Sequence, residues 1–392
     1  MNTLRIAIIG CGKIADQHIA AIRRISNCEV VAACDREELM ARQLAERFNI
    51  VSVFSDAQQM LKAAFPDVVH ITTPPQGHFL LAKQCLEAGS HVYLEKPFTV
   101  TAAEAEELIA LAEYKNLKIT AGHNYQFAPE MVQMRRLVAD GFLGGKPLHV
   151  ESYWAYDLGD TSYVGPLLGS KTHWVRQLPG QLYHNLISHG IARLAEFLDK
   201  EISNITVLSH QSQKLKSLGG QEVQDELRVL IRDQSGTTAF FCFSTQIKPA
   251  LNFFRICGAK NSIAVDFTGG DLICCDSKSY KSYLTYFIPP LKNARQHFWN
   301  GLSNIFNFLR GRLHQDFGMK ELIERFYQSI RDKSAPPISY REIILTAKIM
   351  DEIFKQVYPP GAASPESSPF LKNEIRADHI GKERAIVLRQ NA

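Results

Sequence analysis

The 392-residue sequence predicts an α/β protein in which an N-terminal, doubly wound parallel sheet precedes a C-terminal α+β domain with an open, mostly antiparallel sheet. Two observations predict this arrangement. Over residues 1–124, short apolar strands alternate with amphipathic helices, as in a parallel sheet covered on both faces. Over residues 125–357, strands of alternating polarity are joined by short turns that contain glycine, which is typical of antiparallel pairing.

The composition narrows the class of protein. A hydrophobic content of 45% and a charged content of 21% are those of a globular protein, and the net charge of +4 is too small to predict nucleic-acid binding. The eight cysteines form no C-x-x-C pair and no metal-binding box, so we expect no metal and reduced thiols in the cytoplasm. We expect no signal peptide and no bilayer-spanning segment, and we expect residues 358–392 to form a flexible tail.

A glycine-rich turn follows the first strand. Residues 4–9 form an apolar run, Gly10-Cys11-Gly12-Lys13-Ile14-Ala15 follows, and a helical pattern begins at once. G-x-G-x-x-A between a strand and a helix is the fingerprint of a Rossmann dinucleotide-binding domain. Gly10 permits the tight turn, Gly12 lets the backbone approach a pyrophosphate, and Lys13 and Ile14 stand at the helix N-terminus that faces the phosphates.

An acid ends the second strand. Asp35 closes the apolar run at residues 30–35, at the position where a carboxylate bonds a ribose 2′-hydroxyl. A carboxylate there repels a 2′-phosphate, so we expect NAD, with NADP less favoured. Arg36 is a candidate to accept a phosphate and leaves NADP open. The alternative is that Asp35 serves only as a turn or helix-capping residue.

Polar residues also follow the later strands. The carboxyl ends of parallel strands share one edge, so these residues should rim a single crevice and contact the cofactor. The residues expected there are Thr73, Pro74, His78, Glu95, Lys96 and Asn124. A lysine in such a crevice has an easily shifted pKa and can donate or accept a proton. The alternative is a surface lysine that pairs with Glu95.

Taken together, these motifs resemble the Gfo/Idh/MocA family of glucose–fructose oxidoreductases and inositol dehydrogenases. The residues that carry the resemblance are Gly10 to Ala15, Thr73-Pro74-Pro75 with His78, Glu95-Lys96-Pro97, and Gly122-His123-Asn124. The resemblance covers residues 1–275, and more loosely residues up to 357. It implies that Lys96 contacts both the cofactor ribose and a substrate hydroxyl, and that the bond before Pro97 is cis. It also implies subunit pairing through one sheet face, in a homodimer or homotetramer.

A second candidate cluster lies between the first strands of the C-terminal domain. A helix predicted over residues 182–198 places Asn185 and His189 one turn apart, with Arg193 below. The family pattern Gly-Gly-x-x-x-Asp-x-Gly-x-His fits His189 but has Asp where this chain has Asn185. His189 can relay a proton, whereas Asn185 can only orient a hydroxyl. We therefore expect Lys96 and His189 to be catalytic with Asn185 positioning; the alternative is that His189 is a buried residue capped by Asn185.

Residues 277–315 form a basic insertion with six Lys or Arg and no acid. Apolar and aromatic residues recur at helical spacing from Phe298 to Leu313, which predicts a basic amphipathic helix. One interpretation is peripheral contact of residues 292–313 with the inner face of a membrane, by an enzyme of nucleotide-linked or lipid-linked sugars. The other, which we favour from sequence, is packing on the second domain or at a subunit interface.

The resemblance implies an NAD-dependent oxidoreductase that transfers a hydride between NAD and a secondary alcohol of a sugar, sugar derivative or nucleotide sugar. We expect Lys96 to take the hydroxyl proton, assisted by His189. Two alternatives remain. One is an NAD-dependent lyase or glycosidase in which the redox step is transient and internal. The other is a non-catalytic NAD-binding protein, because Asn185 stands where the family has Asp.

Overall fold

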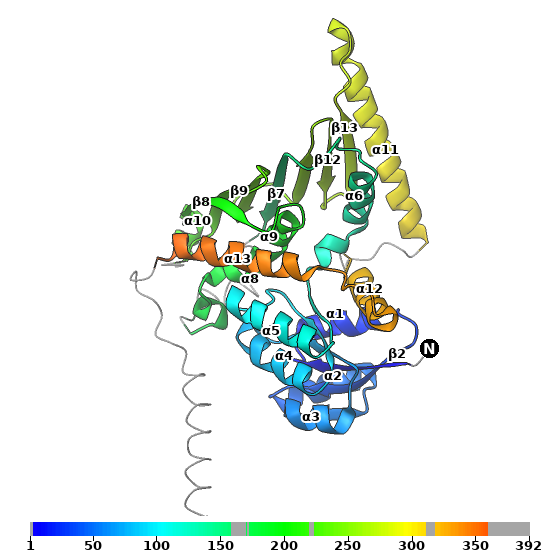
Figure 1. Cartoon of the computed structure of the whole chain (residues 1–392), viewed down its shortest axis with the longest axis vertical. Coiled ribbons are helices and arrows are strands. Elements are labelled where there is room, and N and C mark those ends of the chain that lie inside the picture. Colours follow the sequence, from blue (N-terminus) through cyan, green and yellow to red (C-terminus); the bar gives the residue numbers. More distant parts are fainter. Residues whose placement is uncertain (1–2, 158–169, 171, 219–222, 311–317, 360–392) are drawn as a thin grey trace, which may run out of the picture.

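The computed structural model describes residues 3–157, 170, 172–218, 223–310 and 318–359. Two domains lie one above the other in Figure 1, the first coloured blue to cyan and the second green to yellow. The expected flexible tail lies outside the described residues, apart from Tyr358 and Pro359. No helix in the described part of the chain is both long enough and apolar enough to cross a bilayer.

The first domain contains a six-stranded parallel sheet in the order β3-β2-β1-β4-β5-β6, which confirms the predicted doubly wound arrangement. The order reverses between β1 and β4, and ligands of such sheets bind at this reversal. The strands are β1 (Leu4–Ile9), β2 (Cys28–Cys34), β3 (Ser52–Phe54), β4 (Val68–Ile71), β5 (His91–Leu94) and β6 (Ile119–Ala121).

Helices cover both faces of this sheet because each presents an apolar stripe to it. The helices are α1 (Lys13–Ile22), α2 (Glu38–Phe48), α3 (Ala57–Ala64), α4 (His78–Glu87) and α5 (Ala102–Tyr114). A further helix comes from far along the chain: α12 (Met319–Asp332) buries Leu322, Phe326 and Tyr327 in the same core and lies beside α1.

The second domain contains a seven-stranded sheet in the order β13-β12-β11-β7-β10-β9-β8, and only the β7–β10 pair is parallel. The predicted open, mostly antiparallel sheet is therefore confirmed. The strands are β7 (His149–Ala155), β8 (Ile202–His210), β9 (Glu226–Asp233), β10 (Thr238–Ser244), β11 (Phe253–Cys257), β12 (Asn261–Asp266) and β13 (Asp271–Asp276). We did not predict β13, whose apolar run is only four residues long.

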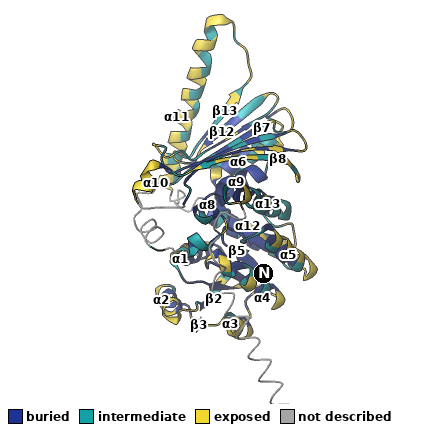
Figure 2. Ribbon diagram, turned by 90° about the vertical axis from the view of Figure 1, so that its left-hand side faces the viewer, coloured by how far each residue is buried: buried dark blue, intermediate teal, exposed yellow. Residues whose placement is uncertain are grey.

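Helices cover one face of this sheet and leave the opposite face open (Figure 2). Leu208 of β8 and Leu230 of β9 are exposed, at positions that alternate with the more buried residues of their strands. The helices are α6 (Pro129–Ala139), α8 (Gln181–Leu186), α9 (Ser188–Ala195), the short α10 (Gln213–Ser217) and α13 (Tyr340–Val357). Helix α13 bridges the domains, since Ile343 belongs to the first core and Ile349 and Phe354 to the second. A last helix, α11 (Ile288–Leu309), runs along β13.

The prediction of one continuous helix over residues 182–198 is wrong, because the chain breaks at Ile187 into α8 and α9. The two halves pack on different partners. Helix α8 packs on the single-turn helix η3 (Trp174–Gln177), whereas α9 packs on β7 and α13. Asn185 and His189 consequently belong to different helices.

Candidate active site

The glycine-rich turn after β1 has the backbone geometry that its sequence predicts. Gly10 has φ +94°, and a Cβ built there would lie 2.8 Å from the backbone of Thr72 and Thr73, so only glycine fits. Gly12 differs, because a Cβ there would meet nothing within 4 Å. Open space therefore lies beside the N-terminus of α1, where Lys13 is exposed and Ile14 is half-buried. That space suits the phosphates of a dinucleotide.

Asp35 links this turn to the end of β2. Its carboxylate accepts the N–H of Cys11 at 2.7 Å and the N–H of Glu37 at 2.9 Å. Asp35 therefore has the turn role considered as an alternative, whereas α2 is capped at Glu37. The turn role does not use up the carboxylate, since each oxygen has a second lone pair. Asp35 is half-buried and Arg36 is exposed beside it.

His78 contacts the backbone of both loops that follow β4 and β5. Its Nε2 lies 2.9 Å from the carbonyl of Thr73, and its Nδ1 lies 3.0 Å from that of Pro97. The ring is fully buried, and burial lowers its pKa. His78 therefore positions the loops that carry Thr73 and Lys96 instead of facing the crevice, while Pro74 is exposed at the rim.

Lys96 stands at the end of β5. The Lys96–Pro97 bond is cis, as the resemblance implied. The Lys96 ammonium donates to the backbone carbonyl of Asn185 at 3.2 Å, across the boundary between the domains. Burial lowers the pKa of Lys96, and the neighbouring Glu95 carboxylate opposes this effect. A lysine in this setting holds its proton less firmly than an exposed one.

A chain of buried hydrogen bonds supports Glu95. Its Oε1 lies 3.0 Å from His18 Nε2, the Nδ1 atoms of His18 and His70 are 2.8 Å apart, and His70 Nε2 lies 2.8 Å from the hydroxyl of Tyr327. Burial alone would raise the pKa of Glu95, but the hydrogen bond from His18 and the neighbouring Lys96 lower it. Glu95 is therefore ionised beneath Lys96 at neutral pH.

A pattern of protons in which both histidines are neutral satisfies every bond in this chain. The ionised Glu95 accepts from His18 Nε2–H, His18 Nδ1 accepts from His70 Nδ1–H, and His70 Nε2 accepts from the Tyr327 hydroxyl. We assign these tautomers from the network. Burial, and then His18, lower the pKa of His70, which agrees with a neutral ring. The network fixes Glu95 without placing a further charge in the core.

His189 faces Lys96 from α9 and lies among aromatic rings. Its ring centroid is 4.9 Å from that of Tyr125, 5.4 Å from Trp154 and 5.8 Å from His123. Burial, followed by the positive charge of Lys96, lowers the pKa of His189. Its Nδ1 has no hydrogen-bond partner among the described residues. His189 is therefore neutral at physiological pH and retains the capacity to take up a proton.

Of the residues that surround His189, the sequence placed Arg193 below it on the predicted helix but assigned it no role. Arg193 is fully buried, and its guanidinium carbon lies 4.5 Å from the centre of the Phe267 ring and 5.1 Å from that of Trp154. Burial lowers its pKa to about 9. His123 was visible in the Gly-His-Asn motif, beside the buried Asn124, but was assigned no role. Trp154 lies in β7 and Phe267 directly follows β12, both distant in sequence from His189, so no local signal could have placed them there.

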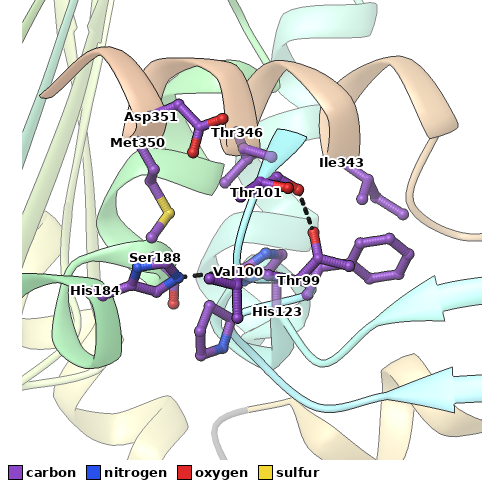
Figure 3. A pocket seen from close by; sticks show the side chains of 13 residues that line it. Thr99, Val100, Thr101, His123, His184, Ser188, Ile343, Thr346, Met350 and Asp351 are labelled. Atoms are coloured by element: carbon purple, nitrogen blue, oxygen red, sulfur yellow. Dashed lines mark hydrogen bonds between the residues drawn. The ribbon is translucent and has the colours of Figure 1, made fainter. Parts of the chain in front are cut away.

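A small cavity lies behind the Lys96–Pro97 turn (Figure 3). It is lined by residues 97–101, by His123, by His184 and Ser188 of the broken helix, and by α13. His184 lies on this side: its Nε2 is 3.4 Å from the carbonyl of Thr99, and its ring stacks on Phe354. The turn that carries Lys96 is thus held by α8 and α13 together.

Open space at a helix N-terminus, an acid at the end of β2 and a buried lysine at the boundary between the domains are the features of a dinucleotide-binding protein with a group able to move a proton. Residues 4–123 match the NAD-binding Rossmann fold of the Gfo/Idh/MocA oxidoreductase family, and residues 131–264 match the C-terminal domain of that family. The chain belongs to this family.

Curated relatives are similar over part of the chain. The D-glucoside 3-dehydrogenase of Escherichia coli K12 is 37% identical over 144 residues, which are 36% of this chain and 41% of the relative. The D-apiose dehydrogenase of Paraburkholderia graminis is 32% identical over 138 residues, 35% of this chain and 37% of the relative. The chain therefore spans about two fifths of the length of these relatives.

Solved structures share the whole fold. The WlbA dehydrogenase of Bordetella pertussis, in complex with NADH and UDP-GlcNAcA, superposes with a TM-score of 0.71 at 15% identity, covering 91% of this chain and 96% of that one. An NAD-binding oxidoreductase from Klebsiella pneumoniae gives 0.72 at 19% identity, covering 91% and 97%. These likenesses show that both domains have the family architecture.

Proposed function

We propose that the protein is an NAD-dependent dehydrogenase that transfers a hydride between NAD and a secondary alcohol of a sugar, sugar derivative or nucleotide sugar. The observation that carries the proposal is the placement of Lys96. Its ammonium reaches the domain boundary, bonds the carbonyl of Asn185 at 3.2 Å, and has a pKa lowered by burial. His189 stands beside it as a second proton carrier.

The cofactor site suits NAD better than NADP. The turn at Gly10 and Gly12, with the start of α1 at Lys13 and Ile14, would hold the pyrophosphate. The Asp35 carboxylate would accept the ribose 2′-hydroxyl and repel a 2′-phosphate. The rim residues Thr73, Pro74, Glu95, Lys96 and Asn124 would line the nicotinamide half, with His78 behind them. When bound, NAD supplies the hydride acceptor.

The chain's own residues handle the proton. Neutral Lys96 accepts the proton of the substrate hydroxyl, and the ammonium that forms is stabilised by the Glu95 carboxylate beside it. We propose that His189 assists as a neutral ring, since burial and then the charge of Lys96 lower its pKa. Asn185 contributes through its backbone carbonyl, which holds the Lys96 ammonium in place. The Asp of the family pattern is not needed for this role.

The substrate class is supported by the relatives and by the lining of the site. One relative is named for a D-glucoside, another for D-apiose, and the Bordetella structure contains a nucleotide sugar. In this chain Tyr125 and Trp154 pack around His189, in a T-shaped pair 4.7 Å apart. Such aromatic walls suit the apolar faces of a sugar ring.

The first prediction is that Lys96→Met binds NAD but transfers hydride at least about 100-fold more slowly, because the proton acceptor is gone. The assay follows reduced-nicotinamide absorbance with NAD and a panel of sugars and nucleotide sugars. Lys115→Met, at the exposed end of α5, is the matched control and should keep full activity. Turnover by Lys96→Met within a few-fold of wild type would contradict the proposal.

The same assay separates the alternatives. NAD that stays bound without net reduction, together with cleavage of a substrate, would favour an internal-redox lyase or glycosidase. Bound NAD with no turnover of any substrate would favour a non-catalytic NAD-binding protein. A rise in reduced nicotinamide with one class of sugar would instead identify the substrate class directly.

We also propose a homodimer or homotetramer that pairs through the helix-free face of the second sheet, where Leu208 and Leu230 are exposed.

We further propose that the protein resides in a reducing compartment, the cytoplasm, because its cysteines form no disulfide bonds. All eight are free, and burial raises the pKa of thiols such as Cys11 and Cys34 to about 12, which makes them unreactive.

A further inference from the structure

Helix α11 (Ile288–Leu309) turns its apolar face away from the protein, unlike an ordinary surface helix. It lies along β13, the edge strand of the second sheet, and extends beyond it (Figures 1 and 2). None of its 22 residues is buried. A surface helix normally turns its apolar stripe toward the core, so this arrangement needs a physical reason.

The reason lies in the polar face, which covers the open edge of the sheet. Gln296 accepts the N–H of Cys274 at 2.9 Å and donates to its carbonyl at 3.1 Å, and Asn300 donates to the carbonyl of Leu272 at 2.9 Å. Asn304 donates to the carbonyl of Gly270 at 3.2 Å. Four helical residues rise about 6 Å and two strand residues about 6.6 Å, so the two ladders match. The amides thereby satisfy an edge that would otherwise be unpaired.

With its polar face on the sheet, α11 presents its apolar face to the outside. Eight large apolar side chains of this helix are 40% to 75% exposed: Leu291, Phe298, Trp299, Leu302, Ile305, Phe306, Phe308 and Leu309. The preceding Tyr283, Tyr286 and Phe287 extend the patch. The interpretation that this segment packs on the second domain is confirmed for α11, which packs on β13 through its amides and leaves its apolar side chains exposed.

The charged side chains that this segment itself contributes are all positive. Residues 277–315 contain no Asp or Glu. Lys281, Arg295 and Arg310 are exposed beside the apolar side chains, and Arg310 lies over the ring of Phe306. Lys292 differs, because it pairs with Asp276 of β13. Arg312 and Leu313 lie outside the described residues.

We propose that the apolar face of α11 is a membrane-docking surface that lies flat on an anionic phospholipid bilayer. The apolar and aromatic side chains would enter the boundary between headgroups and acyl chains, and Lys281, Arg295 and Arg310 would contact acidic headgroups. The helix lies on the bilayer and does not cross it, in agreement with its many polar residues.

Charge decides between a bilayer and a second copy of the chain as the occupant of this face. Two copies of α11 packed face to face would bring their arginines and lysines together with no acid from this segment to pair with them. An anionic bilayer supplies the missing negative charge and buries the aromatic residues in one step. Exposed Trp, Tyr and Phe beside Lys and Arg are the composition of interfacial helices.

The test is co-sedimentation of the full-length protein with vesicles of phosphatidylcholine alone or mixed with phosphatidylglycerol. We expect binding to the mixed, anionic vesicles and little binding to the neutral ones. The variant Phe298→Ser/Leu302→Ser/Ile305→Ser and the variant Lys281→Gln/Arg295→Gln/Arg310→Gln should each lower the partition coefficient on anionic vesicles at least about tenfold.

The matched control is Leu39→Ser/Val51→Ser/Tyr114→Ser, which removes three exposed apolar side chains from the first domain and should bind vesicles like wild type. A second measurement is the fluorescence of Trp299, which should shift to shorter wavelength with anionic vesicles only, and the shift should be lost in Trp299→Phe. An unchanged thermal transition shows that each variant is folded.

Either of two results would overturn the proposal: failure of the wild-type protein to bind anionic vesicles, or binding of the α11 variants to these vesicles as strongly as wild type. If wild type ignores vesicles and the Phe298→Ser/Leu302→Ser/Ile305→Ser variant forms a smaller assembly in light scattering, α11 is a subunit interface instead. The proposal is independent of the catalytic one, since neither variant touches the crevice.

Discussion

The adjacent residues Glu95 and Lys96, which follow β5, have different roles because their side chains point in different directions. The Glu95 side chain turns into the first domain, where it accepts from His18 and from the backbone N–H of Lys96. The Lys96 side chain turns outward to Asn185. The carboxylate is thus a fixed charge beneath a lysine whose pKa is lowered by burial, and it limits how far that pKa falls.

This arrangement predicts the pH dependence of alcohol oxidation. The rate should rise with pH as Lys96 loses its proton, with a midpoint below the pKa of an exposed lysine. In Glu95→Gln the negative charge that raises the pKa of Lys96 is gone, so the midpoint should move to lower pH. The measurement is kcat/KM against pH for wild type, Glu95→Gln and the exposed control Glu46→Gln. A midpoint that moves to higher pH in Glu95→Gln would show that Lys96 is not the titrating group.

The site residues that could be predicted from the sequence are those that directly follow a predicted strand. Gly10, Asp35 and Lys96 each follow an apolar strand, and topology brings such ends together. His18, His70 and Tyr327 could not be predicted, because their hydrogen bonds join positions up to 257 residues apart. The one local signal was a histidine inside the apolar strand Val68–Ile71, where a buried polar group requires a partner.

At the scale of elements, the break between α8 and α9 decides where the catalytic candidates lie. Gly190 permits α9 to approach the sheet, since a Cβ there would lie 2.3 Å from the Phe241 ring of β10. It directly follows His189, so the depth of α9 sets the position of that imidazole. Helix periodicity alone could not reveal this, because both halves keep the same apolar spacing.

We therefore predict that Gly190→Ala lowers both stability and turnover. The added methyl overpacks the core, which costs about 1 to 3 kcal/mol of unfolding free energy, and it displaces His189. Gly301→Ala is the control, because a Cβ there meets nothing within 4 Å in α11 and alanine favours the helix. Urea unfolding and steady-state kinetics measure both effects. If Gly190→Ala were as stable and active as wild type, the close approach of α9 would not be needed.

Helix α11 shows that an amphipathic pattern can locate a helix without revealing which face of the helix contacts the protein. The pattern correctly located a basic amphipathic helix but not which face meets the protein. That depended on β13, an unpredicted edge strand whose backbone groups required partners. Where hydrogen bonds to a sheet edge are available, a row of Asn and Gln can outweigh the usual burial of apolar residues.

At the scale of the whole molecule, the last two described helices tie the domains together. Helix α12 completes the first core and supplies Tyr327 to the chain beneath Glu95. Helix α13 contributes to both cores, and its Asp351 accepts the N–H of Ala102 at the start of α5, at 2.9 Å. The crevice is therefore framed by elements that are distant in sequence. Its integrity should depend on folding of the entire chain.

The buried histidines make that folding sensitive to acid. Burial lowers the pKa of five of them, to about 4 for His123 and His184. The others are His70, His78 and His189. In the unfolded chain each takes up a proton below about pH 6.5, whereas the folded ring stays neutral. The unfolded state then binds more protons, so the unfolding free energy must fall as the pH drops through this window.

We predict that the unfolding free energy is highest above about pH 6.5 and falls toward about pH 5, by up to about 1.4 kcal/mol per pH unit for each buried histidine. Burial raises the pKa of carboxyls such as Glu130 and Glu342; these groups act in the opposite direction above the ordinary carboxyl pKa and reduce the net slope. His184→Gln, which can keep the bond to Thr99, should reduce the slope by one group. Urea unfolding at several pH values measures the slope, and a flat or rising profile toward acid would mean that these rings are protonated in the folded protein.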